Sequence, residues 1–537
     1  MTTRLAPRVS LRTALAGVAS IALTVSLAAC SGGSGGSTEQ VDRAAQTSAC
    51  PPLDDSVDES QHFTWIYSVD NSSFDPDHIT TNNSLMYLLP IYDSLVHVNE
   101  KGEPEPMLAK TWKVSKDGNT LTMTLIDGWK YHDGTPFDAA SVVANIKRSQ
   151  EPGGFNVNAL SSVKDVRALD EHTVEFTVDD GSAGALVGIL GGAAGMMMSP
   201  KVFDDPSQDV KPTGGSGAFT MERYVSGSRV EYKAVKNYWD PDALNVSGMT
   251  YLVSGDDNAR LNAVLTGAAD ATFLRASMYD TAKQSDNVVC EAPSLSSYQI
   301  TLNTKRSEFG KKEVREALNY AIDRNAVSAV TDGFLEPGVQ MFPDWFWAAN
   351  KDITAENTYQ YDPEKARQLL EQAGLEDGFS FEMEVINLDL YQQIAEVIQA
   401  NLADVGIDVS IRPVEIDALA ENFSVSKNVD AQLSEQKAEA DPSILTASYY
   451  HRNSFNNPGG WGTPEIERLD VAARKGASPE ERAPLYADLF DAVMEEVPFN
   501  VVLGHLTTPF VMNKQARGVE IYADGTRSLR GVGKTAD

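Results

Sequence analysis

Segments typical of strands and of helices alternate along the second half of the chain, and this order restricts the fold more than any other feature. Residues 407–414 and 500–506 have the composition of strands, whereas residues 391–405 and 479–496 have the apolar spacing of helices. Such alternation predicts helices layered against a sheet, an α/β or α+β architecture, and excludes a sandwich or a helix bundle. The length of 537 residues exceeds one ordinary core and indicates two or three domains.

The first half of the chain contains the same kinds of element. Residues 120–126 and 172–178 alternate polar and apolar side chains, which is typical of half-buried strands. Residues 137–146 have the pattern of a helix, and Asp138 is placed to cap its start. Residues 183–198 are apolar but short and rich in glycine, so we expect a buried, tightly packed segment rather than a membrane span.

The first thirty residues have the pattern of an export signal. Three arginines precede an uncharged, largely apolar stretch at residues 13–29, which is too short for a membrane span of about 20 residues. The stretch ends in Leu-Ala-Ala followed by Cys30, which resembles a bacterial lipobox. This predicts cleavage after residue 29 and a lipid on Cys30 that anchors the chain to the outer face of the cell membrane. An unmodified signal peptide with a chance cysteine is the alternative.

Residues 30–61 are expected to form a flexible tether, because they open with glycine and serine and continue as a polar run. Cys50 and Cys290 are the two cysteines that remain besides Cys30. An exported protein matures in an oxidising compartment, which favours a disulfide between them. Two unrelated thiols are the alternative.

The charge of the chain limits its partners. A formal net charge of −32 excludes nucleic acid, whose binding needs a basic surface, and opposes contact with anionic lipid. The seven histidines show no metal-ligand spacing, and no phosphate-binding glycine loop is present, so we expect no metal and no cofactor. A glycosidase-type pair of carboxylates is an alternative that the sequence leaves open, because acidic residues are abundant.

Several phrases occur in an order that identifies a family. The most specific is Gly128-Trp-Lys-Tyr-His-Asp-Gly-Thr-Pro-Phe-Asp-Ala-Ala-Ser-Val-Val143, and others are Pro106-Met-Leu-Ala-Lys-Thr-Trp112, Val314-Arg-Glu-Ala-Leu-Asn-Tyr-Ala-Ile-Asp-Arg324 and Tyr361-Asp-Pro-Glu-Lys-Ala366. From about residue 63 to residue 510 the chain resembles the family 5 extracellular solute-binding proteins, the peptide-binding components of bacterial ABC importers. Taken singly, these phrases are turns, caps and core aromatics, so they identify the scaffold rather than the site.

The resemblance implies a two-lobed fold of the periplasmic-binding-protein type (type II, cluster C) that closes on a ligand lying between the lobes. Such a protein acts as a monomer and delivers its ligand to permease and ATPase subunits. Candidate hinge strands cross near residues 303–304 and 503–504. The implied domains are lobe 1 at residues 62–103, 213–303 and 505–537, an extra domain at 104–212, and lobe 2 at 304–504.

Asp441 is the first candidate for ligand contact. The resemblance implies that an aspartate in such an Asp-Pro segment receives the ammonium group of a peptide, and a charge-assisted hydrogen bond in a dry cleft suits that task. Equally, Asp441 fits the cap of a helix whose first turn contains Pro442. Ser443 stands where the family often has a second aspartate, which is a departure from the pattern.

Further candidates are aromatic residues and one arginine that follow the same segments. An arginine can clamp a carboxylate end, and aromatic rings stack on sugars or on peptide groups. Each of these side chains also suits ordinary packing. The candidates are Tyr298, Tyr450, Arg452, Trp461, Trp345 and Trp347.

Three functions follow from these observations. The first is a surface lipoprotein that captures short peptides for an ABC permease. The second keeps the scaffold but binds an oligosaccharide, a nickel chelate or another small solute, and tryptophans lining the cleft would favour a sugar. The third is a secreted hydrolase.

Overall fold

The computed structural model describes residues 50–179, 181–437, 439, 441–521 and 527–536. The predicted signal segment, Cys30 and most of the predicted tether lie outside these residues. Within them, no helix is long and apolar enough to cross a membrane.

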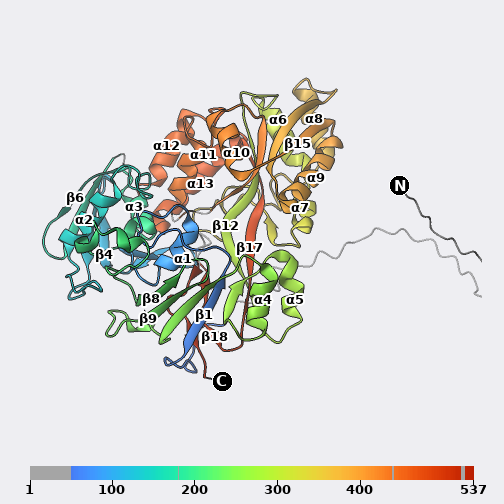
Figure 1. The fold of residues 1–537 in the computed structure, drawn as a ribbon. Coiled ribbons are helices and arrows are strands. Elements are labelled where there is room, and N and C mark those ends of the chain that lie inside the picture. The colour runs from blue at the N-terminus through green and yellow to red at the C-terminus, as the bar shows by residue number, and fades with distance from the viewer. Residues whose placement is uncertain (1–49, 180, 438, 440, 522–526, 537) are drawn as a thin grey trace, which may run out of the picture. The chain divides into compact units, whose positions relative to one another are not determined.

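One mixed 11-stranded sheet runs through the described chain (Figure 1). Helices cover it, so the predicted α/β architecture is confirmed. The strands lie in the order β15 (Ile407–Val414), β14 (Phe379–Ile386), β16 (Ala431–Gln436), β12 (Val288–Leu302), β17 (Asn500–Met512), β11 (Ala271–Phe273), β1 (His62–Tyr67), β10 (Gly248–Val253), β9 (Arg229–Ala234) and β8 (Phe219–Val225), with β13 (Leu335–Pro337) paired to β17.

The two longest strands, β12 with 15 residues and β17 with 13 residues, join the two sides of this sheet. They pair antiparallel, and their register shifts between Pro293 and Ser297 and again between Tyr298 and Gln299. Such bulges bend a strand and increase its twist. We call this region the crossover. Gly504 of β17 lies in it, opposite Tyr298, so the second predicted hinge strand coincides with a bulge. The hinge itself stays a prediction.

Helices cover both faces of the β14 side of the sheet because their apolar stripes need a partner. Figure 1 shows α10–α13 to the left of the long strands and α7–α9 to the right. The strand predicted at residues 407–414 and the helices predicted at 391–405 and 479–496 are confirmed within two residues at each end. The helices are α6 (Lys312–Ala321), α7 (Arg324–Val330), α8 (Pro363–Gln372), α9 (Asp389–Ala403), α10 (Ile416–Ala420), α11 (Pro442–Tyr450), α12 (Pro464–Ala473) and α13 (Pro479–Glu495), with a π-helical turn η7 (Glu421–Val425) after α10.

A separate four-stranded antiparallel sheet lies in the first half of the chain, in the order β4 (Ala109–Val114), β5 (Thr120–Leu125), β7 (Thr173–Val178) and β6 (Val163–Ala168). Helix α2 (Ala139–Ser149) covers it, and Asp138 accepts a hydrogen bond from the Ser141 amide in a capping box, as the sequence predicts. Helix α3 (Ala183–Ile189) is buried over its first six residues, which confirms a packed rather than membrane-spanning segment.

Short elements complete the described chain. The 3₁₀ turns are η1 (Asn82–Ser84), η2 (Ala193–Gly195), η3 (Pro200–Val202), η4 (Pro206–Asp209), η5 (Pro241–Ala243) and η6 (Ala276–Met278), and the short helices are α1 (Leu85–Leu88), α4 (Asp257–Leu265) and α5 (Tyr279–Lys283). The short strands are β2 (Val96–Val98), β3 (Pro104–Pro106), β18 (Ala516–Arg517), β19 (Glu520–Ile521), β20 (Arg527–Ser528) and β21 (Gly533–Lys534).

Four hydrophobic clusters form the interior of the part of the chain that the structure describes. The largest contains buried residues between 295 and 503, on the β14 side of the sheet. A second contains residues of the β1 side, a third joins the four-stranded sheet to α2 and α3, and a fourth packs under α4 and α5. The exact domain boundaries given above stay predictions.

The N-terminal arm is fastened to the β1 side of the sheet. Cys50 forms a disulfide with Cys290 of β12, which confirms the predicted pair. Asp54 accepts a hydrogen bond from Arg517, and Val57 forms a β-bridge with Thr535. The arm therefore reaches the body at a fixed place beside the C-terminal segment.

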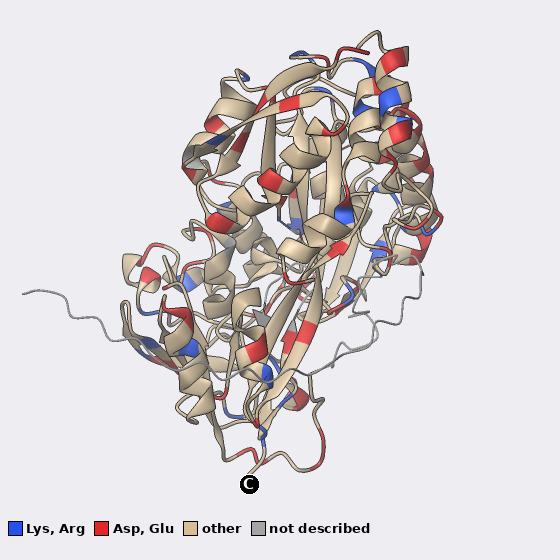
Figure 2. Cartoon of the chain, turned by 90° about the vertical axis from the view of Figure 1, so that its right-hand side faces the viewer, with Lys and Arg blue, Asp and Glu red and all other residues tan. Residues whose placement is uncertain are grey.

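Acidic residues are spread over the surface. Figure 2 shows Asp and Glu along the whole length of the ribbon, with fewer Lys and Arg among them. This distribution follows from the 76 acidic and 44 basic residues of the chain. It forms a broadly acidic exterior, which is unfavourable for anionic polymers.

Candidate ligand-binding site

Strands from both sides of the sheet end at the crossover. β1 is parallel to β11, and β11 pairs antiparallel with β17 from Met512 to Phe510, so β1 runs toward the crossover. From the other side, β16 runs antiparallel to β12 and ends at Gln436, opposite Ser297. The carboxyl ends of β1 and β16 therefore face the crossover from opposite directions. In open α/β sheets, crevices at the carboxyl ends of strands are the usual ligand sites.

Three side chains near these strand ends have polar atoms without a partner among the described residues. Asn71, four residues beyond β1, is 8% exposed, and neither its amide nitrogen nor its amide oxygen is bonded. Gln436 is 3% exposed and equally unpaired, and the hydroxyl of the fully buried Ser297 lies opposite it on the same face of the sheet. Buried polar groups in proteins are nearly always hydrogen-bonded, so these atoms indicate a missing partner.

Tyr298 points to the other face of the sheet. It is 6% exposed, lies opposite Glu435, and packs edge-on against Tyr391 at 5.3 Å between ring centres. Burial raises the pKa of Tyr298, and the negative charge of Glu435 adds to this effect. The phenol is protonated at neutral pH, as an unperturbed tyrosine would be.

Asp441 has two partners within the chain. Its Oδ1 accepts a hydrogen bond from the Ser443 amide at 2.9 Å, so the predicted helix cap is confirmed for α11. The buried Arg482 donates two more hydrogen bonds, from Nη1 to Oδ2 at 2.7 Å and from Nη2 to Oδ1 at 2.8 Å. Burial lowers the pKa of Arg482, but the Asp441 carboxylate outweighs it and the net shift is upward.

The Asp441–Arg482 pair connects to Trp347, whose ring lies 5.2 Å from the guanidinium. The indole nitrogen of Trp347 donates to the carbonyl of Gly102 at 3.1 Å, so the cluster touches a loop outside the β14 side of the sheet. The cavity among these residues and Gly184 measures about 10 Å³, room for roughly one water molecule. In this conformation no solute fits there.

Close to that cavity, α3 contacts the loop between α12 and α13. The amide of Ala185 donates to the carbonyl of Arg474 at 3.3 Å. A Cβ added at Gly184 would lie 1.8 Å from the carbonyl oxygen of Gly476, so only glycine permits this approach. The described chain is therefore in a conformation in which these two segments are shut against each other.

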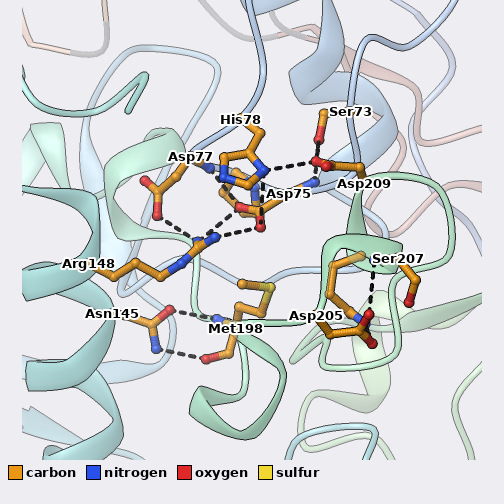
Figure 3. A network of polar contacts seen from close by, with 12 residues as sticks. Ser73, Asp75, Asp77, His78, Asn145, Arg148, Met198, Asp205, Ser207 and Asp209 are labelled. Carbon is orange, nitrogen blue, oxygen red and sulfur yellow. Dashed lines mark hydrogen bonds and ion pairs between the residues drawn. The ribbon is translucent and has the colours of Figure 1, made fainter. Parts of the chain in front are cut away.

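An acidic group of three residues, Asp75, His78 and Asp209, brings possible metal-binding atoms within 4.8 Å of one another. Figure 3 shows that Arg148 reaches into this group, donating to both oxygens of Asp75 at 2.9 and 2.6 Å, while His78 lies 2.9 Å from Asp209. The guanidinium supplies the positive charge that the carboxylates need. We therefore interpret the group as an ion-pair network that joins α2 to the segment after β1.

Comparison with known proteins identifies the scaffold. Residues 103–457 match the model of the bacterial extracellular solute-binding proteins, family 5 Middle, which is more than half of the chain. The chain belongs to this family. It is therefore a binding protein of ABC importers and not an enzyme, and the family acts outside the cytoplasm.

Individual relatives of this family 5 protein extend the match. The glutathione-binding protein GsiB of Salmonella paratyphi A is 28% identical over 450 residues, which covers 80% of this chain and 86% of that protein. HbpA2 from Haemophilus parasuis has a similar structure, with a TM-score of 0.79 and 22% identity over 88% of this chain and all of that one. DppA from Helicobacter pylori, in complex with the peptide STSA, gives a TM-score of 0.71 at 22% identity and covers 89% and 99%.

The structure places the other predicted contacts of this family 5 protein in different surroundings. Trp461 is 6% exposed and packs against Tyr450 and Phe499, at 5.9 and 5.6 Å between ring centres, inside the largest hydrophobic cluster. Tyr450 itself is 1% exposed. Arg452 and Trp345 are both more than a third exposed, and Arg452 pairs with Glu467. Ligand contact by any of them stays a prediction.

Asp470 of α12 is the centre of a second polar cluster, which joins α11 to α12. Asp470 is buried and bonded by Thr446, His451 and Arg474. Burial raises the pKa of Asp470, but its hydrogen bonds and the charge of Arg474 lower it by more. The net pKa therefore lies below the usual value of an aspartate. The ring of His451 is thus held against α12 by its contact with Asp470.

Asn71, Ser297 and Gln436 were missed by the sequence interpretation. The sequence contains part of a signal for two of them, because β12 and β16 alternate polar with apolar residues near the crossover. Only the structure shows that the polar set is buried as well as the apolar one. A strand that is polar on a buried face predicts a partner for that face. Asn71 carries no comparable pattern, since it lies in a loop.

Proposed function

We propose that this chain is a lipid-anchored family 5 binding protein that captures short peptides at the crossover and delivers them to an ABC permease. The observation that carries the proposal is the pair of unbonded, buried amide side chains, Asn71 and Gln436. Each follows or ends a strand that runs toward the crossover, one from each side of the sheet.

The chemistry of these groups favours a peptide. A side-chain amide presents donors and an acceptor, which is the complement of a peptide group. A ligand bonded to both amides touches both sides of the sheet, so it favours whichever conformation brings the sides together. The Ser297 hydroxyl adds a further donor and acceptor beside Gln436.

The relatives support the same ligand class. One is named for glutathione and another is a complex with a peptide. Two of the three tryptophans that would favour a sugar are engaged within the chain, because Trp461 is packed in a hydrophobic cluster and Trp347 bonds to Gly102.

Lipid attachment is proposed from Cys30 and the residues before it. The fastened arm supports it, since Cys50 fixes the place where the tether leaves the body. Expression of the full chain and of Cys30→Ser tests it. The parent should sediment with membranes and the variant should be released; equal partition of both contradicts the anchor.

Calorimetry with a library of di- to pentapeptides tests the ligand class. Gln436→Leu should weaken binding of every peptide at least tenfold, because the amide contacts main-chain groups common to all, whereas Gln360→Leu changes an exposed amide and should have no effect. Failure of all peptides, together with clear binding of another solute, would overturn the proposal.

A further inference from the structure

Four polar residues form a straight row across four strands on the β14 side of the sheet. Glu384 of β14 lies opposite Gln432 of β16, Gln432 opposite Thr301 of β12, and Thr301 opposite Asn500 of β17. Directly paired residues of neighbouring strands share one face of a sheet, so the four side chains point the same way. They are 0%, 8%, 0% and 1% exposed, respectively. We call them the polar row.

The polar row has acceptor atoms without donors. Oε2 of Glu384, Oε1 of Gln432, Oγ1 of Thr301 and Oδ1 of Asn500 have no partner among the described residues. A sheet face packed under helices is normally apolar, and buried polar atoms are normally bonded. Four neighbouring exceptions in one row indicate that a group rich in hydrogen-bond donors belongs there.

Helical segments cover the row. The amide of Asn422 in the π-helical turn η7 donates to Oε1 of Glu384 at 2.8 Å, and Arg412 pairs with the same oxygen. On the same face, Gln299 donates to the Tyr449 hydroxyl of α11 at 2.7 Å. A π-helical turn within a helix is often found at functional sites. Here it holds one oxygen of Glu384 and leaves the other unbonded.

The row continues the face that carries Ser297 and Gln436. Gln432 precedes Gln436 by four residues on β16, so the side chains of both lie on one face. At about 3.3 Å per residue the distance along the strand is roughly 13 Å. An extended peptide of three to four residues, or a shorter one with a long side chain, spans that length.

We propose that the polar row is the specificity pocket of the solute site and receives an ammonium or guanidinium group of the ligand. An ammonium has three donors and no acceptor, which matches a carboxylate oxygen, an amide oxygen and a hydroxyl. The inference rests on the proposed peptide-binding function, which it refines by naming the side chain that the peptide carries.

Matched ligands test it. Glycyl-glycyl-lysine and glycyl-glycyl-norleucine have side chains of similar length with and without the ammonium group, and cadaverine supplies the ammonium groups without a peptide. In calorimetry the parent protein should bind the lysyl peptide at least tenfold more tightly than the norleucyl peptide. Glu384→Gln should reduce that preference below threefold.

Glu382→Gln is the control, because Glu382 lies on the same strand and bonds the same Arg412 but its side chain is 44% exposed. It should keep the preference. Thr301→Val is a second variant that keeps the side-chain volume, and it should also weaken the preference. Either variant of the row is informative if its urea unfolding resembles that of the parent.

The outcomes separate the two proposals. Equal binding of both peptides by the parent, or a preference that survives Glu384→Gln and Thr301→Val, overturns the pocket and leaves peptide binding intact. If neither peptide binds but cadaverine raises the melting temperature of the parent and not of Glu384→Gln, the pocket stands and peptide binding falls. If neither the peptides nor cadaverine have an effect, both the pocket and peptide binding are refuted.

Discussion

Replacing Asp441 by alanine removes a helix cap and one half of a buried ion pair at once. Asp441 and Arg482 have side chains that are 3% and 5% exposed, and two hydrogen bonds join them. Breaking a buried pair from one side costs about 3–5 kcal/mol, because the remaining charge has no compensation. Loss of the cap adds about 1 kcal/mol. We therefore expect the free energy of unfolding to fall by about 4–6 kcal/mol.

Equilibrium unfolding in urea measures this loss. Asp362→Ala is the matched control, since Asp362 caps α8 through the Lys365 amide at 2.9 Å but is exposed and has no arginine partner. It should lose only about 1 kcal/mol. If Asp441→Ala loses no more than Asp362→Ala does, the ion pair contributes nothing and the reasoning is refuted.

A ligand role for Asp441 predicts something different. Asp441→Asn keeps Oδ1, which accepts from both the Ser443 amide and Nη2 of Arg482, and loses only the acceptor for Nη1, so it preserves more of the fold than alanine does. If Asp441 receives a peptide ammonium group, affinity should fall by about 2–5 kcal/mol for this variant. Unchanged peptide affinity would assign Asp441 to the helix cap and the ion pair alone.

Three further predictions follow from other contacts. Gly184→Ala should reduce peptide affinity about 10- to 100-fold, because overpacking of about 1–3 kcal/mol arises only where α3 touches Gly476. Gly255→Ala is the control, since its Cβ would meet nothing nearer than 3.9 Å. Equal affinities of the two variants would show that the contact of α3 with Gly476 plays no part in closure. Burial lowers the pKa of His505 from 6.5 to about 4, so the contribution of the neutral ring to the free energy of unfolding is full above pH 6.5 and declines toward pH 4. Between pH 7 and pH 4.5 the parent should lose about 2–3 kcal/mol more than His505→Gln in urea unfolding. Identical losses would refute the burial effect. Replacing both Cys50 and Cys290 by serine should lower the free energy of unfolding by about 2–5 kcal/mol in the same assay. No change would show that the arm is held without its disulfide.

Local pattern was enough to predict much of the fold. The strand-like composition of residues 407–414 and the capping position of Asp138 depend on neighbours within a few residues, and both predictions are confirmed. The Cys50–Cys290 disulfide required only that two cysteines remain in an oxidising compartment. Features of this kind are determined by residues within one segment, or by the number of cysteines that the chain contains.

The site was harder to predict because its contacts are not local. Arg482 lies 41 residues from Asp441, and nothing in either segment indicates that they meet. The aromatic candidates were judged by residue type, which does not distinguish a ring over a ligand from a ring in a core, as Trp461 shows. Helix capping by Asp441 was predictable, and its arginine partner was not.

The polar row illustrates the same limit and also its remedy. Its residues come from four strands whose positions in the chain differ by up to about two hundred residues, and the row exists only through the register of three strand pairs. A shift of one residue in any pair would turn one side chain to the opposite face. The sequence does contain half of the information, because β12 and β16 alternate polar with apolar residues, and the structure adds that the polar set is buried. A buried polar set has to be bonded, so a register that aligns several such sets concentrates the requirement for donors at one place. That place lies on the face of the sheet that ends at the crossover. The register of the strands therefore determines which chemical groups of a ligand this face can bind.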